Sequence, residues 1–323
     1  MKRIEPQLTE KYRKDPVQES FLERFNNILQ PYQEEDYIED LPEEYPTVHV
    51  IGVPRSGTTL VTQILATHTD IGYINNLIAA FWKAPVYGIR LSSQVVPRNL
   101  KSSYQSEFGR TKGIHEPHEF GYFWSELLHY REMLEQENKD DIDWKRVRLV
   151  LTNMALAFGR PVLFKSFLLG WHVTEVQKIL PRTCWIHVYR DPLANILSLL
   201  KLRKELLGSV EKWASLKPKE YTFLRKQSYL EQVVGQYYFL ERSYREQLAQ
   251  IPTDNVFHLS YEDFCRNPNA VLSDFQKMLN RQNSSIKITS EAPKFTPNIH
   301  QSSELEMAVN KLLEKLQENY GSL

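Results

Sequence analysis

The chain has little cysteine, no long hydrophobic run and no excess of either charge. Two cysteines among 323 residues, Cys184 and Cys265, do not make a disulfide framework or a metal cluster. No apolar stretch approaches the roughly 20 residues that a membrane-spanning helix requires. The start of the sequence is charged rather than apolar, which argues against a secretory signal. We therefore expect a reduced, cytoplasmic protein without a membrane span.

The balance of charges also argues against large anionic partners. Forty basic residues balance forty acidic residues, so the chain lacks the overall field that would recruit nucleic acid or an anionic membrane. With 41% apolar and 25% charged residues, the composition is that of an ordinary globular protein. Any anion-binding site has to be local.

The sequence suggests one large domain with two appendages. We place an N-terminal helical arm at 1–45, with a helix from Gln18 to Leu29 and a loop near Gln30-Pro31. The α/β domain follows at 46–285. The extension at 286–323 carries an amphipathic helix near Glu304 to Asn319, which docks on the domain or on a second subunit of a homodimer.

Short apolar runs alternate with helical patterns along the domain. Five runs are predicted to be strands: Val48 to Val53, a weak one at Ile71 to Ile74, Val162 to Phe167, Cys184 to Tyr189, and Val256 to Tyr261. Helical patterns lie at Thr59 to Thr67, Trp144 to Phe158, Val173 to Ile179, Leu193 to Leu206, and Tyr229 to Ile251. This alternation predicts an α/β fold, a single P-loop-like domain whose central, mainly parallel five-stranded sheet is flanked by helices. Ligands of such sheets bind at the carboxyl ends of the strands.

The most informative segment follows the first predicted strand and runs Pro54, Arg55, Ser56, Gly57, Thr58, Thr59, Leu60. A glycine-containing turn that opens a helix aims backbone N–H groups and a positive helix end at one point, where phosphate or sulfate binds. The spacing from Gly52 nearly matches a nucleoside-triphosphate P-loop, but Thr58 stands where that loop requires lysine. The lost lysine argues against ATP or GTP hydrolysis. An ordinary strand–turn–helix connection is the alternative interpretation.

Arginines supply the positive charge in this part of the chain. Arg55 is the only cation inside the loop, and its planar fork suits two oxygens of one anionic group. The fourth strand runs into Arg190-Asp191-Pro192, where a good N-cap and a good first helical residue make a sharp turn. Ser198 follows roughly two helical turns later, so that it and Arg190 reach a single phosphate. The alternative for Ser198 is a bond back to a backbone carbonyl.

Together these motifs resemble those of sulfotransferases that use 3′-phosphoadenosine 5′-phosphosulfate (PAPS). Pro54 to Leu60 resembles the family's 5′-phosphosulfate loop, and Arg190-Asp191-Pro192 with Ser198 resembles its 3′-phosphate motif. Phe164-Lys165-Ser166 resembles the strand that carries the family's active-site lysine. Leu259 to Phe264, with Asn267-Pro268 beyond, is similar to the segment near the adenine. The motifs occur in the family's order between residue 48 and about 280.

The resemblance implies metal-free, in-line transfer of a sulfuryl group from PAPS to an acceptor hydroxyl on a carbohydrate, lipid or small metabolite, leaving adenosine 3′,5′-bisphosphate. It implies donor contacts at Pro54, Arg55, Ser56, Gly57, Thr58, Thr59, Leu60, Arg190, Ser198 and Tyr261. Lys165 and Arg55 are the candidate cations beside the leaving oxygens. A P-loop kinase or nucleotidase and a non-catalytic nucleotide-binding relative remain as alternatives.

The acceptor hydroxyl has to lose a proton, so a histidine or carboxylate is expected nearby. Cytosolic relatives place a histidine two positions after the strand lysine, where this chain has Phe167. The segment from Gly113 to Trp124 resembles the acidic segment of carbohydrate-directed, peptide-directed and bacterial relatives. We take Glu116 as the first candidate base, Glu119 as the second and His118 as the third.

We expect Pro117 to start a helix with Glu116 at its N-terminus. A metal site at His115, Glu116, His118 and Glu119, or a solvated polar turn, is the alternative.

Two other segments bear on the site. Phe81 to Lys112 lacks a clear period and is either a cover over the site or a solvated surface loop. Aromatic residues near it are numerous and suit either an acceptor pocket or the core: Phe81, Trp82, Tyr87, Phe120, Tyr122, Phe123 and Trp124. No basic-glycine cluster follows Arg281, so Lys287 and Lys294 are weak candidates for completing the 3′-phosphate site.

Overall fold

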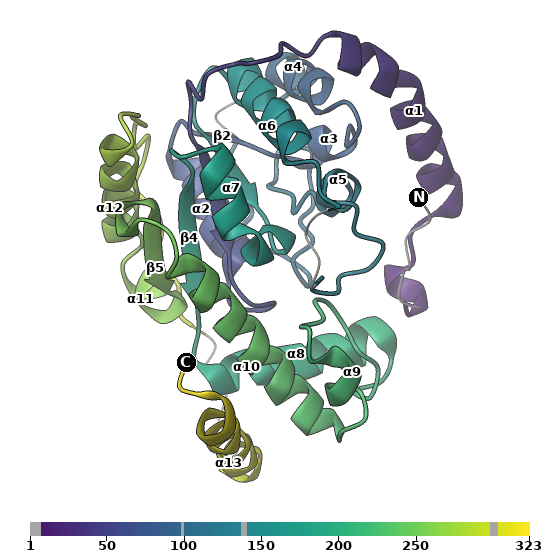
Figure 1. The fold of residues 1–323 in the computed structure, drawn as a ribbon, viewed down its shortest axis with the longest axis vertical. Helices are drawn as coiled ribbons and strands as arrows, with labels where there is room; N and C mark the ends of the chain where they lie inside the picture. The colour runs from purple at the N-terminus through teal and green to yellow at the C-terminus, as the bar shows by residue number, and fades with distance from the viewer. Residues whose placement is uncertain (1–7, 98–99, 137–140, 298–302) are drawn as a thin grey trace.

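A computed structural model describes residues 8–97, 100–136, 141–297 and 303–323 and is built around one parallel sheet (Figure 1). The strands are β1 (Thr47–Ile51), β2 (Gly72–Tyr73), β3 (Val162–Lys165), β4 (Cys184–Tyr189) and β5 (Val256–Ser260). They lie in the order β2-β3-β1-β4-β5, and every neighbouring pair is parallel. The predicted α/β fold with a five-stranded parallel sheet is confirmed.

Helices cover both faces of this sheet. On one face, α2 (Thr58–His68) and α12 (Pro268–Arg281) pack on β1 and β4, where Ile186 and Val188 share their apolar cluster. On the other face, Trp185 belongs to the cluster formed with α6 (Trp144–Phe158), α7 (Val173–Ile179) and α10 (Tyr229–Leu248). Because successive strand side chains point to opposite faces, burial on both faces requires the continuous apolar runs seen in the sequence.

Shorter elements complete the chain around this core. They are η1 (Glu10–Tyr12), α1 (Pro16–Glu35), α3 (Asn76–Ala79), α4 (Pro85–Val95), α5 (Gly121–Leu127), η2 (Leu168–Trp171), α8 (Pro192–Leu207), α9 (Tyr221–Leu224), η3 (Thr253–Asn255), α11 (Tyr261–Arg266) and α13 (Ser303–Tyr320). Helix α4 lies inside the segment 81–112, whose sequence showed no clear period. Its side chains Val86 and Ile89 are buried in the core.

The N-terminal helix is held to the domain by buried amide side chains. The side chain of Asn26 donates to the carbonyl of Ala80 at 2.8 Å and accepts from the backbone N–H of Lys83 at 2.8 Å. Gln33 accepts from the backbone N–H of Val86 at 2.9 Å. Helix α1 continues through Pro31 to Glu35, so the loop predicted at Gln30-Pro31 is wrong. The buried hydrogen bond of Gln33 to Val86 lies beyond the proline and holds this end of the helix.

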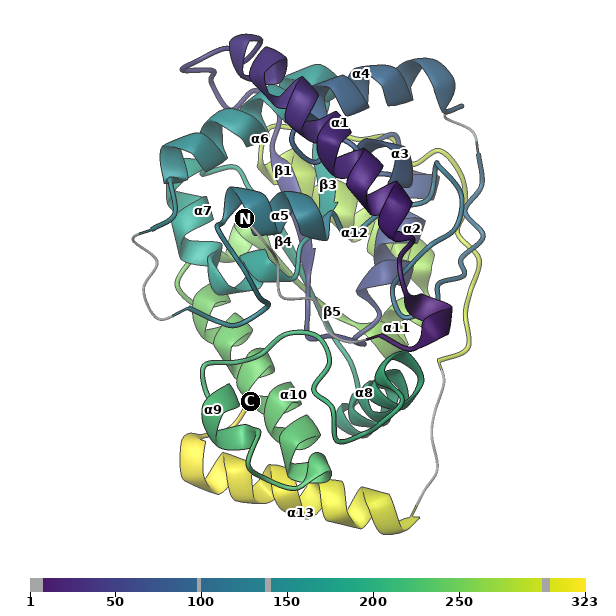
Figure 2. The same cartoon turned by 90° about the vertical axis from the view of Figure 1, so that its right-hand side faces the viewer.

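The last helix packs on the chain's own domain. Figure 2 shows α13 across the foot of the molecule beside α10, and α1 crossing the side near α3 and α4. Val309 and Leu313 are buried in the cluster that α10 shares, which is one of the two arrangements that the amphipathic pattern left open. None of the described helices is both long and apolar enough to cross a membrane.

Candidate active site

Residues from four strands meet at the carboxyl edge of the sheet. Lys165 ends β3, the 52–57 turn follows β1, Arg190 follows β4, and Tyr261 follows β5. Because the strands lie in the order β3-β1-β4-β5, these groups stand in the same order along the edge. The structure therefore brings together residues that lie more than two hundred positions apart in the sequence.

The turn after β1 is shaped to receive an anion. The backbone N–H of Ser56 donates to the carbonyl of Val53 at 3.1 Å, and Gly57 caps α2 with φ of 102°. The first N–H groups of a helix have no partner within it, and in α2 they begin at Thr58. The Ser56 hydroxyl is buried and has no hydrogen-bond partner among the described residues. Unpartnered donors at a helix N-terminus fit a phosphate or sulfate.

Glycine is required at position 57 for two reasons. A positive φ of 102° is a conformation that residues with a side chain rarely adopt. A Cβ atom there would also lie 2.1 Å from Cδ2 of Tyr261, well inside contact distance. The turn after β1 and the start of α11 therefore pack directly on each other.

The two predicted anion sites adjoin. Arg55 Nε donates to Ser198 Oγ at 3.0 Å, and Arg190 Nη1 donates to the carbonyl of Arg55 at 3.4 Å. The Arg190 guanidinium also lies 4.8 Å from the centre of the Tyr261 ring. Burial, and then the charge of Arg190, lower the pKa of Arg55. An anion bound between the two guanidiniums would offset the repulsion between their charges.

Lys165 places an ammonium group beside the loop. Its Nζ atom donates to Thr59 Oγ1 at 2.8 Å and to Glu119 Oε2 at 3.2 Å, and its side chain is 3% exposed. A lysine from the neighbouring strand β3 therefore contacts the start of α2. A Cβ atom built on Gly109 would lie 3.2 Å from this Nζ, so the chain around Gly109 passes close to the site.

The comparisons with known proteins decide the family. A model of the sulfotransferase family matches residues 46–282. The chain belongs to the sulfotransferase family. Among solved structures it is similar to sulfotransferase STF9 from Mycobacterium avium, with a TM-score of 0.58 and 15% identity over 98% of this chain and 87% of that one. It is also similar to sulfotransferase STF1 from Mycobacterium tuberculosis H37Rv, with a TM-score of 0.51 and 12% identity over 94% of this chain and 82% of that one.

At these identities the two structures establish the fold alone. A search of curated proteins finds no match to the sequence. Family membership indicates a sulfotransferase enzyme.

The three candidate bases of this sulfotransferase lie in different surroundings. Glu119 is 30% exposed and pairs with Lys165. His118 accepts a hydrogen bond from the backbone N–H of Phe120 at 2.8 Å through Nδ1. The protein packed around its ring, and then the charges of Lys165 and Lys14, lower the pKa of His118, although the residue as a whole is exposed.

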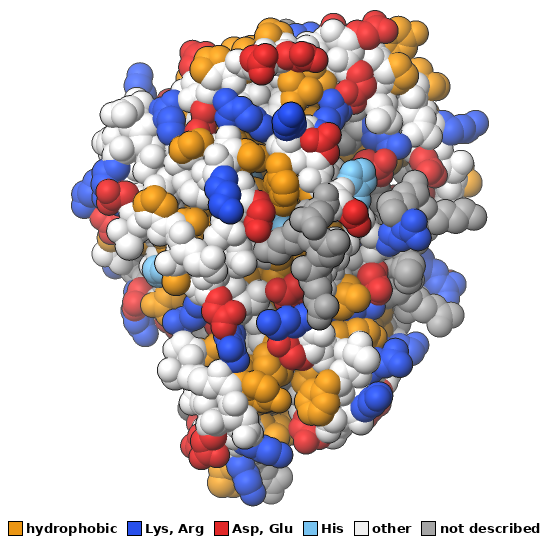
Figure 3. Space-filling view, in the orientation of Figure 1, with side chains coloured by type: hydrophobic (Ala, Val, Ile, Leu, Met, Phe, Trp, Pro, Cys, Tyr) orange, Lys and Arg blue, Asp and Glu red, His pale blue; other side chains and the backbone are white. Residues whose placement is uncertain are grey.

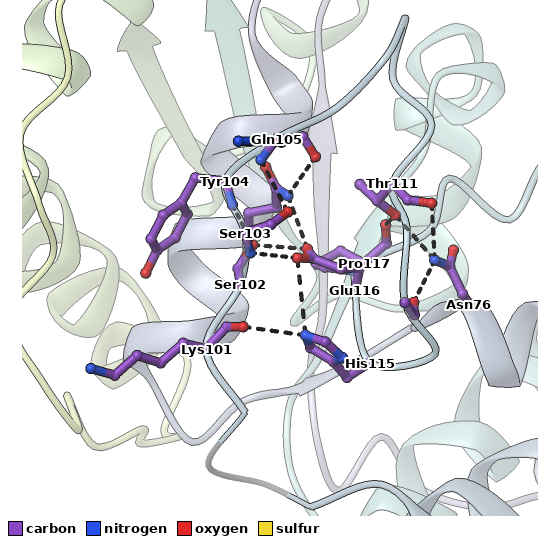
Figure 4. A network of polar contacts seen from close by, with 12 residues as sticks. Asn76, Lys101, Ser102, Ser103, Tyr104, Gln105, Thr111, His115, Glu116 and Pro117 are labelled. Carbon is purple, nitrogen blue, oxygen red and sulfur yellow. Dashed lines mark hydrogen bonds and ion pairs between the residues drawn. The ribbon is translucent and has the colours of Figure 1, made fainter.

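Glu116 is fully buried at the centre of a polar network (Figure 4). Its carboxylate accepts from the backbone N–H of Ser103 at 2.6 Å, from Ser102 Oγ at 2.8 Å and from Gln63 Nε2 at 2.9 Å. Burial alone would raise the pKa of this carboxyl, but the donated hydrogen bonds together lower it. Glu116 thus ties the segment around Ser102 to α2.

The prediction that Pro117 starts a helix is wrong, because α5 begins at Gly121. Pro117 instead forms a bridge with Asn75. The backbone N–H of Asn76 donates to the carbonyl of Glu116 at 3.0 Å, and that of His118 donates to the carbonyl of Ile74 at 2.9 Å. These bonds to the chain after β2 hold the segment extended.

Sequence reasoning missed Phe108 and Gly109. The Arg55 guanidinium lies 5.4 Å from the centre of the Phe108 ring, and Glu107 accepts a hydrogen bond from Tyr12 Oη at 2.7 Å. The segment that showed no clear period therefore does cover part of the site, held by the N-terminal residues. The sequence feature that could have indicated this contact is a phenylalanine followed by glycine in a polar stretch.

One of the weak candidates for the 3′-phosphate site, Lys287, lies elsewhere. The backbone N–H of Lys287 donates to Asp70 just beyond the end of α2, so Lys287 is near the end of the helix opposite the 52–57 turn. In the described part of the chain, no group of three or more His, Cys, Asp or Glu side chains is arranged to hold a metal ion.

Proposed function

We propose that the protein transfers a sulfuryl group from PAPS to the hydroxyl of an acceptor, in the cytoplasm and without a metal. The observation that carries the proposal is the order of groups along the sheet edge, from Lys165 through the 52–57 turn to Arg190 and Tyr261. A donor with a sulfate at one end and a 3′-phosphate and adenine at the other matches the order of these groups along the edge.

The residues present suit each part of that donor. Backbone N–H groups from Gly57 to Leu60 and the unpartnered Ser56 hydroxyl would hold the 5′-phosphosulfate. Arg190 and Ser198 would hold the 3′-phosphate, and Arg55 stands at the junction of the two sites. These arginines are largely buried, so their attraction for an anion is screened less than at the surface.

Lys165 and Glu119 are placed to serve the reacting end. When bound, PAPS supplies the sulfuryl group and a bisphosphate leaving group. Lys165, held by Thr59, would neutralise charge that develops on the leaving oxygen. Glu119 would accept the proton of the acceptor hydroxyl, because it pairs with Lys165 and keeps part of its surface open.

Glu116 then takes a positioning role. All its hydrogen bonds go to protein groups, and no part of its surface is open to an acceptor. We therefore move Glu119 ahead of Glu116 as the proposed base. His118 stays third because its ring stands beside the same lysine but accepts a backbone hydrogen bond.

Calorimetry and turnover together test the proposal. Adenosine 3′,5′-bisphosphate is expected to bind without magnesium, and Glu119→Gln and Lys165→Met are expected to keep that binding while losing turnover of PAPS with a mixture of acceptors. Binding of ATP only with magnesium would favour a kinase instead. Tight bisphosphate binding with no turnover on any acceptor would identify a non-catalytic relative.

A further inference from the structure

The outer side of helix α1 carries a row of exposed apolar side chains, which we call the α1 stripe. Its four members are each more than half exposed: Val17 at 75%, Phe21 at 51%, Ile28 at 64% and Tyr32 at 59%. Their spacings of four, seven and four residues put them within about 60° of one another around the helix. Figure 1 places α1 at the upper right edge of the molecule, and Figure 3 shows apolar side chains along that edge.

The helix that carries the stripe is fixed in place. Its opposite side is held by the buried side chains of Asn26 and Gln33, which bond to the backbone near α3 and in α4. Phe25 also packs edge-on against Phe81, with 5.1 Å between the ring centres. Turning the stripe inward would break these contacts, so a partner is needed to remove it from water. Single exposed apolar residues are ordinary, whereas a row of four on an anchored helix marks an interaction surface.

The stripe is symmetric about its midpoint. The outer pair, Val17 and Tyr32, and the inner pair, Phe21 and Ile28, share a midpoint just after Arg24. Consider a second copy of the helix that runs in the opposite direction and is related by a two-fold axis at this midpoint. Phe21 would lie against Ile28 of the partner subunit, and Val17 would lie near Tyr32 of the partner subunit. An interface between two identical surfaces requires this self-complementarity.

The charges at the ends of the helix fit the same arrangement. Lys14 lies just before the helix and Glu35 ends it, and these two positions have the same midpoint as the stripe. Each end of the antiparallel pair would bring a lysine to a glutamate of the other subunit, and opposed helix dipoles attract each other. The axis also sets Arg24 beside Arg24 of the partner subunit, which is a contact between like charges.

We propose that the α1 stripe is the interface of a homodimer, in which two antiparallel α1 helices pack on each other about a two-fold axis. The inference does not depend on the proposed function. The amphipathic helix α13 is a poorer candidate, because its Val309 and Leu313 are buried in its own domain. The exposed area of the stripe is on the order of 400 Å² per subunit, about half of what a standard interface buries. We therefore expect a weak dimer, with Kd on the order of 10 μM.

Sedimentation equilibrium over a range of concentrations measures this association. Phe21→Lys is expected to raise Kd at least about tenfold. Phe223→Lys is the matched control, because this phenylalanine of α9 is 54% exposed, and its Kd should stay that of the natural chain. Adding Ile28→Glu to Phe21→Lys should restore most of the association, since each lysine would then face a glutamate. Arg24→Gln should lower Kd, because it removes the like-charge contact.

Introduced cysteines test the antiparallel arrangement. The two natural cysteines are buried, so a cysteine introduced on α1 is the exposed one. Arg24→Cys lies next to the axis and should form a disulfide between subunits on mild oxidation. Val17→Cys should not, because the two copies of this position would be roughly 22 Å apart, far beyond the reach of a disulfide. Cross-linking through both positions would indicate parallel helices and refute the proposal.

A monomer at every concentration also refutes it. So does a dimer that Phe21→Lys leaves intact, or a double variant that associates more weakly than Phe21→Lys alone. A monomer that binds phosphatidylcholine vesicles and loses that binding in Phe21→Lys would assign the stripe to a membrane surface instead. Unfolding midpoints close to that of the natural chain would show that the variants lose association and not the fold.

Discussion

Replacing Glu116 with glutamine separates a positioning role from a catalytic one. In the folded chain three donors converge on the Glu116 carboxylate, from Ser103, Ser102 and Gln63. Glutamine keeps one acceptor oxygen and turns an NH₂ group toward donors that need an acceptor. At least one hydrogen bond to a charged group is lost, and such bonds are worth about 1.5–3 kcal/mol each. We expect the free energy of unfolding to fall by about 2–3 kcal/mol.

Urea unfolding followed by fluorescence measures this loss, and Glu119→Gln is the matched control. Because Glu119 is partly exposed and glutamine keeps an oxygen that can accept from Lys165, its replacement is expected to lower the free energy of unfolding by less than Glu116→Gln does. Its turnover is expected to fall by about 10²–10⁴, the usual contribution of a general base. Turnover of Glu116→Gln, measured well below its unfolding temperature, is expected to fall less than that of Glu119→Gln.

The pH dependence gives a second measurement of Glu116. Its pKa is lowered in the folded chain, so its contribution to stability is present above the unfolded value of about 4.3 and is lost as the pH falls through the folded value. The stability difference between the natural chain and Glu116→Gln should therefore shrink below about pH 4. A stable Glu116→Gln without turnover, beside an active Glu119→Gln, would refute the reasoning and make Glu116 the base.

Three further results are expected. Gly57→Ala should weaken bisphosphate binding at least about tenfold, because a positive φ and the Tyr261 ring leave no room for a methyl group, and unchanged calorimetric affinity would contradict this. Arg190→Ala should weaken binding of adenosine 3′,5′-bisphosphate far more than that of adenosine 5′-monophosphate, and equal losses would remove Arg190 from the 3′-phosphate site. Burial lowers the pKa of His49 to about 3. The unfolded chain binds a proton at His49 below about pH 6.5 and the folded chain does not. His49 should therefore lower the free energy of unfolding by about 1.4 kcal/mol for each pH unit as the pH is lowered from about 6 to 4. In His49→Phe that slope should be smaller by the same amount, and parallel slopes in urea titrations would show that His49 does not contribute.

The sequence was sufficient to predict the sheet and the edge at which the site forms. Lys165 and Arg190 each follow a buried apolar run, and parallel strands bring their carboxyl ends to one edge. The strand and helix patterns also gave β4, α6 and α7 their observed bounds. These features depend on local periodicity, which a single sequence carries.

Long-range packing was harder to predict. The ranking of Glu116 and Glu119 as candidate bases depends on whether Ser102 and Gln63, from separate segments, donate to one carboxylate. Nothing in the neighbourhood of either glutamate indicates this contact. Pro31 was misjudged for the same reason, because a buried glutamine farther along α1 holds the helix to α4.

The strand origin of Lys165 has a consequence for redesign. In a nucleoside-triphosphate loop the lysine is part of the loop and moves with it. Here the cation comes from the adjacent strand, and the register that pairs Val50 with Lys165 sets where it stands. Grafting the turn alone onto another scaffold would carry the amides without the ammonium group. The smallest transplantable unit is the pair of neighbouring strands together with that turn.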